Sequence, residues 1–144
     1  MDNDFKREII LENYQHPFNK VNEEQLGYIK VNSNNESCID NINIYLKFDK
    51  DILVDIKFDG EACAISTAST SIMLKNLIGK NINEIEEFIE NFNNMVEEKD
   101  YNEDLLKEAI AFDEIYKQQN RKTCVILPYL GIKKALKEYK ENYE

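Results

Sequence analysis

The chain has 144 residues, the usual size of one domain and enough for a single sizeable core. Its 18 basic and 28 acidic side chains give a net charge of −10, which excludes nucleic acid as an expected partner because phosphate backbones select basic surfaces. The apolar runs are too short for a membrane span or a signal peptide, so no membrane partner is expected. Three cysteines, an odd number without an export signal, favour reduced thiols and a cytoplasmic location over a disulfide framework.

The charges are unevenly distributed along the chain. Residues 84–104 hold nine acids and one base, Lys99, whereas residues 117–140 hold seven bases and one acid, Glu138. Each stretch is typical of a solvated helix face. The alternative is a docking surface for a partner of opposite charge, because complementary fields steer encounter.

The first predicted element is a short amphipathic helix over residues 4–14, with apolar side chains on one face. The pair His16-Pro17 ends it, because a residue before proline is pushed out of the helical region. His16 is the only histidine, and its position at this helix exit favours a surface turn over a Cys–His catalytic dyad.

The next three predicted elements are strands. The segment 27–32 is short and edge-like, and 42–48 and 52–58 show a period of two, joined by a hairpin turn at 49–51. The last strand is expected to place four apolar side chains on its buried side: Ile52, Val54, Ile56 and Phe58. Gly60 then allows a positive φ where the chain leaves the sheet.

Beyond residue 62 the pattern becomes helical. Small side chains hold the next helix, from Ala62 to Gly79, close to the sheet. Another helix is expected to begin at a capping-box-like pair, Asn83 and Glu86. A shorter helix over about 103–117 and a final one over about 122–141 complete the chain.

The element pattern predicts an α+β fold: a small three-stranded antiparallel sheet covered by helices. No internal repeat, low-complexity linker or composition break divides the sequence. We therefore expect one domain over residues 1–144.

Three cysteines and one aspartate form the most informative pattern. Cys38 falls at the start of the first long strand with Asp40 two residues on, and Cys63 follows the strand paired with it. Paired hairpin strands bring these positions to the same end of the sheet. Cys124 would add a third thiolate. Three thiolates and one carboxylate are the four ligands of a closed tetrahedral zinc site. The spacing matches no compact zinc finger, however, and a free cysteine is often only a small buried hydrophobe.

Two of the cysteines are expected near helix N-termini. Cys63 opens the helix that follows the sheet, and Cys124 lies near the start of the last helix. Unpaired N–H groups and the helix dipole favour a thiolate at such positions. Arg121 and Lys122 add positive charge beside Cys124 and are candidate modulators of the site.

Four motifs resemble those of the NifU-like iron–sulfur cluster assembly proteins. The stretch 60–73, Gly-Glu-Ala-Cys-Ala-Ile-Ser-Thr-Ala-Ser-Thr-Ser-Ile-Met, resembles their second cysteine motif, and 124–136 looks like the third. Residues 35–40 are similar to the first cysteine motif, and 10–20 to the first helix and the turn after it. The resemblance covers nearly the whole chain and implies the fold of that family.

The resemblance distinguishes two branches of the family. Thr123 stands where IscU-type scaffolds carry a histidine, and the gap between Cys63 and Cys124 is longer, which looks like the SufU-type branch. The resemblance to that branch implies zinc held by Cys38, Asp40, Cys63 and Cys124. It also implies that persulfide sulfur is accepted at Cys38 from a SufS-type cysteine desulfurase, which would be the main partner.

Two alternatives stay open. One is an IscU-type scaffold that assembles a [2Fe–2S] cluster, or holds iron, on the same three cysteines and passes it to a downstream scaffold or to apo-proteins. The other is a structural zinc-binding interaction module. The chain also departs from the family pattern: Glu36 replaces a proline, and Ile39 and Ala62 replace glycines. These changes reshape the loop that carries Cys38.

Overall fold

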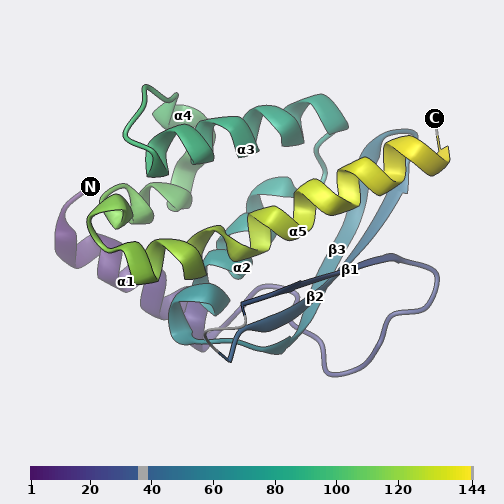
Figure 1. Cartoon of the computed structure of the whole chain (residues 1–144), viewed down its shortest axis with the longest axis horizontal. Helices are drawn as coiled ribbons and strands as arrows, with labels where there is room; N and C mark the ends of the chain where they lie inside the picture. The colour runs from purple at the N-terminus through teal and green to yellow at the C-terminus, as the bar shows by residue number, and fades with distance from the viewer. Residues whose placement is uncertain (36–38, 144) are drawn as a thin grey trace.

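The computed structural model describes residues 1–35 and 39–143 of the chain. One helix, three consecutive strands and a series of helices follow one another along the chain, in the order that the sequence predicts (Figure 1). The elements are α1 (Asn3–Gln15), β1 (Ile29–Asn34), β2 (Asn41–Asp49), β3 (Ile52–Glu61), α2 (Ala64–Leu77), α3 (Ile82–Val96), α4 (Glu103–Leu106), the 3-10 helices η1 (Lys107–Phe112) and η2 (Ile115–Lys117), and α5 (Gln119–Tyr143). No helix among these residues is long and apolar enough to cross a membrane.

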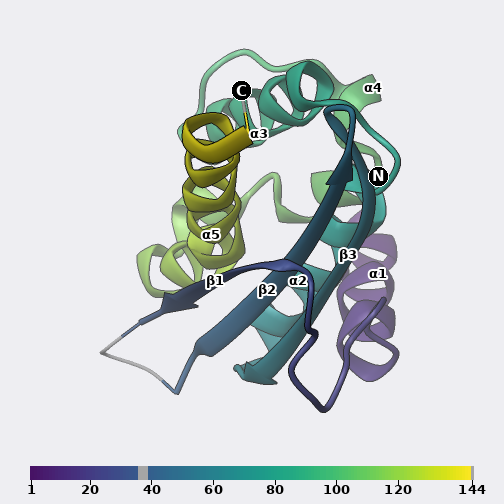
Figure 2. The ribbon, with the colours of Figure 1, turned by 90° about the vertical axis from the view of Figure 1, so that its right-hand side faces the viewer.

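The sheet is antiparallel with the order β1-β2-β3, which confirms the predicted fold class. Apolar side chains alternate along its inner face. Among them Ile42, Ile44 and Leu46 are buried, each with at most 1% of its surface exposed. Helices α2 and α5 lie on this face, and the segment that links α1 to β1 crosses the other face (Figure 2). The core therefore lies between the sheet and the helices.

The predicted inward side of β3 is partly wrong. The pairing register shifts between Lys47 and Phe48, so that Phe48 pairs with Leu53. A bulge inserts one extra residue, and the side chains before it change faces. Leu53 is therefore fully buried, while Ile52 and Val54 are 36% and 46% exposed.

The start of α3 lies two residues earlier than expected. Asn81, not Asn83, caps the helix: its side chain accepts from the N–H of Glu84 at 2.9 Å, and Glu84 Oε1 accepts from the N–H of Asn81 at 3.1 Å. Both Asn81 and Asn83 have a glutamate three residues later, so both fit the pattern. Starting at Asn81 makes Ile82 the first helical residue, and its side chain is buried.

The predicted helix over 103–117 is only partly formed. A single α-helical turn, α4, is followed by the 3-10 helices η1 and η2. Lys107, at the junction of α4 and η1, has a φ of +49°. Four of the five buried apolar side chains of this stretch recur every third residue, namely Leu106, Ala109, Phe112 and Ile115, and the fifth is Ala111. A period of three matches the three residues per turn of a 3-10 helix, which explains the departure from α-helix.

Candidate metal centre

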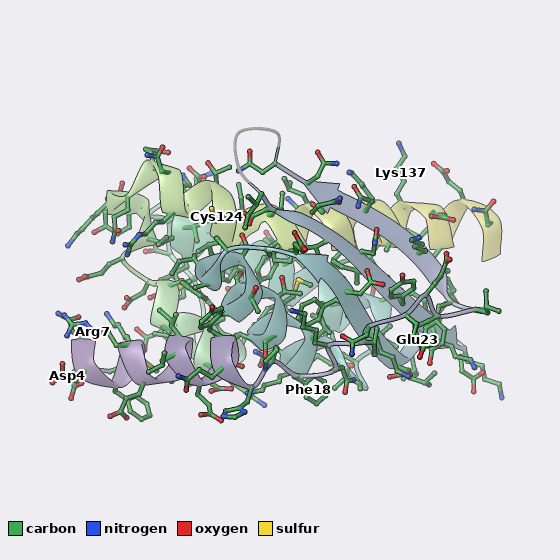
Figure 3. The ribbon with its side chains drawn as sticks, turned by 90° about the horizontal axis from the view of Figure 1, so that it is seen from below. Asp4, Arg7, Phe18, Glu23, Cys124 and Lys137 are labelled. Atoms are coloured by element: carbon green, nitrogen blue, oxygen red, sulfur yellow. The ribbon has the colours of Figure 1, made fainter. Side chains whose placement is uncertain are left out.

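Three of the four predicted ligands meet at one end of the sheet. Asp40 precedes β2, Cys63 lies between β3 and α2, and Cys124 lies in α5, where Figure 3 labels it. One donor atom from each lies within 4.8 Å of the other two. Cys38, the fourth predicted ligand and the predicted sulfur acceptor, lies outside the described residues, as does Glu36.

The close approach of Asp40 to Cys63 follows from the pairing of β2 with β3. Asn41 pairs with Glu61 and Ile42 with Gly60, so the residues just beyond the two strands become neighbours. Gly60 has a φ of +108°, and a Cβ built there would lie 2.1 Å from the carbonyl oxygen of Asn41. Only glycine fits at this position, which confirms its predicted positive φ.

Asp40 is held by hydrogen bonds on both carboxylate oxygens. Its side chain is only 1% exposed. Oδ1 accepts from the backbone N–H of Cys63 at 2.7 Å, and Oδ2 accepts from the hydroxyl of Ser66 at 2.6 Å. Burial opposes ionisation, but the hydrogen bonds from Ser66 and Cys63 outweigh it and hold the pKa of Asp40 below its ordinary value. The carboxylate is therefore fixed and ionised.

Cys63 occupies the N-cap of α2, as predicted. Its Sγ accepts from the backbone N–H of Ser66 at 3.4 Å and lies 3.8 Å from Oδ2 of Asp40. An N-cap side chain satisfies one of the free N–H groups at the helix start. The thiol is thus anchored by the same turn that fixes Asp40.

The setting of Cys124 differs from the prediction. Helix α5 begins at Gln119, so Cys124 lies in its second turn rather than at its start. Burial, the neighbouring Cys63 thiol and the charge of Asp40 raise the pKa of Cys124 to about 12. A thiolate at Cys124 is therefore unfavourable beside Asp40 until a cation offsets the negative charge. Two thiols and a carboxylate are donors that suit zinc, and thiolates also suit iron–sulfur clusters, so the donor set fits both groups.

The two cationic residues before Cys124, Arg121 and Lys122, lie in different environments. Arg121 is exposed. The Nζ of Lys122 lies 2.7 Å from Oε1 of Glu97, an ion pair that ties α5 to the end of α3. The next residue, Thr123, is exposed and donates its hydroxyl to the carbonyl oxygen of Gln119 at 3.2 Å. The position that precedes Cys124 thus offers no donor to the described cluster.

Ser66 is a site residue that the sequence analysis did not single out. Its buried hydroxyl lies 2.6 Å from Oδ2 of Asp40, 3.5 Å from Sγ of Cys63 and 3.1 Å from the carbonyl oxygen of Cys124. The sequence indicates only that the Cys124 carbonyl needs another donor, not which residue approaches it. Pro128 lies four residues after Cys124 inside α5, and a proline at that spacing removes the helical donor of the Cys124 carbonyl.

Comparison with known proteins places this site in a family. A family model described as the NifU-like N terminal domain matches residues 5–144. The iron–sulfur cluster assembly scaffold protein IscU of Thermotoga maritima is 38% identical over 104 residues, which cover 72% of this chain and 73% of that protein. The zinc-dependent sulfurtransferase SufU of Bacillus subtilis is 33% identical over 133 residues, 90% of this chain and 88% of that protein.

Solved structures agree with the sequence comparison. The crystal structure of FiSufU from Fervidobacterium islandicum AW-1, described as an iron–sulfur cluster assembly scaffold protein for the SUF system, superposes with a TM-score of 0.80 at 34% identity, over 90% of this chain and 94% of that one. Fold, sequence and the resemblance of the cysteine motifs therefore lead to the same assignment. The chain belongs to the family of NifU-like N-terminal domains.

Proposed function

We propose that the chain is a SufU-like sulfur-transfer protein of iron–sulfur cluster assembly. In this proposal Cys38, Asp40, Cys63 and Cys124 hold zinc, and Cys38 receives persulfide sulfur from a SufS-like cysteine desulfurase. The observation that carries it is the convergence of the Asp40, Cys63 and Cys124 donors within 4.8 Å. The name of the B. subtilis relative, a zinc-dependent sulfurtransferase, supports the same choice of metal and chemistry.

The described residues have distinct tasks in this mechanism. Asp40 supplies one oxygen donor, already oriented by Cys63 and Ser66. Cys63 and Cys124 supply thiol donors from two helices that pack against each other. When bound, zinc supplies the positive charge that keeps these thiols deprotonated. Near this cluster the N–H of Asn35 donates to the carbonyl oxygen of Asp40 at 3.0 Å, which fixes the backbone of the aspartate ligand.

The sulfur-transfer step is a thiol–disulfide type exchange. The Cys38 thiolate attacks the terminal sulfur of the desulfurase persulfide, a new S–S bond forms on Cys38, and the desulfurase cysteine leaves as a thiolate. No oxidant or reductant is consumed. The chain needs free thiols for this exchange, so we place it in a reducing compartment, the cytoplasm.

Persulfide mapping tests the proposal. The protein is incubated with a SufS-type desulfurase and cysteine, alkylated, and analysed by mass spectrometry. The expected result is one extra sulfur on Cys38 and none on Cys38→Ser, with the variant still folded by circular dichroism. Sulfur located mainly on Cys63 or Cys124 would overturn the assignment of the acceptor.

A second candidate function is an IscU-type scaffold, favoured by the 38% identity to the T. maritima IscU scaffold protein. The same thiols suit a [2Fe–2S] cluster, which would then be passed to a downstream scaffold or to apo-proteins. Anaerobic incubation with iron and sulfide separates the two functions. A scaffold develops the visible absorption of a stable cluster and transfers it to an apo-ferredoxin, whereas a sulfur acceptor that retains zinc does neither.

A further inference from the structure

The carbonyl oxygen of Cys124 lacks its usual backbone donor. In a regular helix it would accept from the N–H four residues later, but that residue is Pro128, which has no N–H. The hydroxyl of Ser66, on α2, lies 3.1 Å from this oxygen. The hydroxyl of a residue on α2 thus lies beside a carbonyl of α5 that lacks its usual backbone donor.

The same hydroxyl also contacts the carboxylate of Asp40. Ser66 Oγ lies 2.6 Å from Oδ2 of Asp40, and Ser66 has no exposed surface. A serine hydroxyl carries one proton and can donate to only one of these acceptors at a time. Hydrogen bonds to a charged acceptor are shorter and stronger, so the proton belongs to Asp40 and the Cys124 carbonyl is the secondary acceptor.

These contacts leave the Asp40 carboxylate little rotational freedom. Its other oxygen is already occupied by the N–H of Cys63 at 2.7 Å. We infer that Ser66 is a positioning residue that fixes the Asp40 carboxylate for one-oxygen metal binding, and that Pro128 keeps the Ser66 hydroxyl between Asp40 and Cys124. The inference rests on the zinc site of the proposed function and adds a residue that binds no metal itself.

Removing the hydroxyl should weaken metal binding without unfolding the chain. We expect Ser66→Ala to lower zinc affinity roughly 10-fold to 100-fold, the usual effect of losing a group that orients a metal ligand. The probe is zinc alone, measured by competition with a chromophoric chelator. Circular dichroism of the metal-free variant checks that it is folded.

Ser69→Ala is the matched control. Ser69 lies one turn further along α2, is 1% exposed, and donates its hydroxyl to the carbonyl oxygen of Val125 at 2.6 Å. It therefore links α2 to α5 as Ser66 does, but within the described part of the chain its hydroxyl bonds to no predicted ligand side chain. Ser69→Ala should lower the melting temperature like Ser66→Ala and leave zinc affinity unchanged.

Pro128→Ala separates the two contacts of Ser66. Alanine restores the N–H that the Cys124 carbonyl lacks, so the double variant Ser66→Ala/Pro128→Ala has a satisfied carbonyl but an unsupported Asp40. We expect its zinc affinity to stay as low as that of Ser66→Ala. Recovery to the wild-type affinity would overturn the inference, because Ser66 would then act only through Cys124.

The remaining outcomes distinguish this inference from the proposed function. Wild-type affinity in Ser66→Ala, with zinc bound normally by the parent protein, would refute the role of Ser66 and leave the proposed function standing. Failure of the parent protein to bind zinc would refute both, because Ser66 would have no metal ligand to position. A loss confined to Ser66→Ala and the double variant supports the inference.

Discussion

The backbone N–H of Cys63 donates to Oδ1 of Asp40 at 2.7 Å, and this bond joins the residue before β2 to the first turn of α2. Two predicted ligands are thus positioned by one contact between a carboxylate and the main chain. The remaining described ligand, Cys124, reaches the cluster from α5, which packs against α2. Three separate parts of the chain therefore have to be folded together before the donors converge.

The charge of Asp40 is expected to matter more for zinc than its shape. Asp40→Asn keeps the size of the side chain but removes the negative donor, and we expect zinc affinity to fall at least tenfold. Chelator competition measures the change. Asp59→Asn is the control, because Asp59 accepts hydrogen bonds from Asn43 and Tyr45 on the outer face of the sheet. Equal losses in the two variants would show that the effect is a general destabilisation.

Removing zinc should destabilise the fold. Zinc bound by the native state alone stabilises it by about 2.7 kcal/mol at a hundredfold excess over the dissociation constant. We expect a chelator to lower the melting temperature of the wild type by several degrees. Cys63→Ser should lose this response, while its start of α2 survives because serine is a good N-cap residue. A melting temperature that ignores the chelator in the wild type would contradict a zinc site that joins α2 to α5.

Gly60→Ala should strongly destabilise the fold. A Cβ at this position would lie 2.1 Å from the carbonyl oxygen of Asn41, next to Asp40, and the φ of +108° is unfavourable for alanine. We expect urea denaturation to show a loss of more than about 3 kcal/mol of folding free energy. Backbone strain alone would cost only about 1–2 kcal/mol. Gly79→Ala provides the comparison, since Gly79 has a φ of +84° and nothing within 4 Å of the added Cβ. Similar losses at the two glycines would show that the close approach to Asn41 has no cost.

Tyr45 gives the stability an alkaline dependence. Burial and the hydrogen bond to Asp59 raise the pKa of Tyr45 from 10.0 to about 12. The folded protein therefore keeps the phenol proton where the unfolded chain loses it, so this contribution is complete below pH 10 and disappears as the pH rises from 10 to 12. Tyr45→Phe should be less stable by about 1 kcal/mol at pH 8, with a shallower decline above pH 10. Urea denaturation across this range measures both, and an unchanged slope would argue against the assignment.

The sequence predicted the site where local rules sufficed. Cys63 follows a glycine turn and opens a run of small residues, so its position at a helix start followed from spacing alone. The setting of Cys124 did not, because its raised pKa comes from burial in the folded chain and from Cys63 and Asp40, which are distant in the sequence. The neighbouring cations Arg121 and Lys122 suggested that the pKa of Cys124 would be lowered. Lys122, however, forms an ion pair with Glu97 at the end of α3.

The fold shows the same division between local and tertiary effects. The three strands and the hairpin were predicted from alternation and turn residues. The buried side of Leu53 was not, since a single bulge reverses the pattern and leaves Val54 exposed. Ser66 was missed because a serine in a small-residue run has no distinguishing neighbour in sequence, and only the folded chain brings Asp40 and Cys124 to it.

X-ray absorption at the zinc K-edge, on protein purified without oxygen, would observe the proposed zinc donors themselves. We expect about one zinc per chain with three sulfur donors at about 2.3 Å, from Cys38, Cys63 and Cys124. We also expect one oxygen donor at about 2.0–2.2 Å, from Asp40. Protein that contains no zinc, or zinc surrounded only by nitrogen and oxygen donors, would contradict the proposed zinc site.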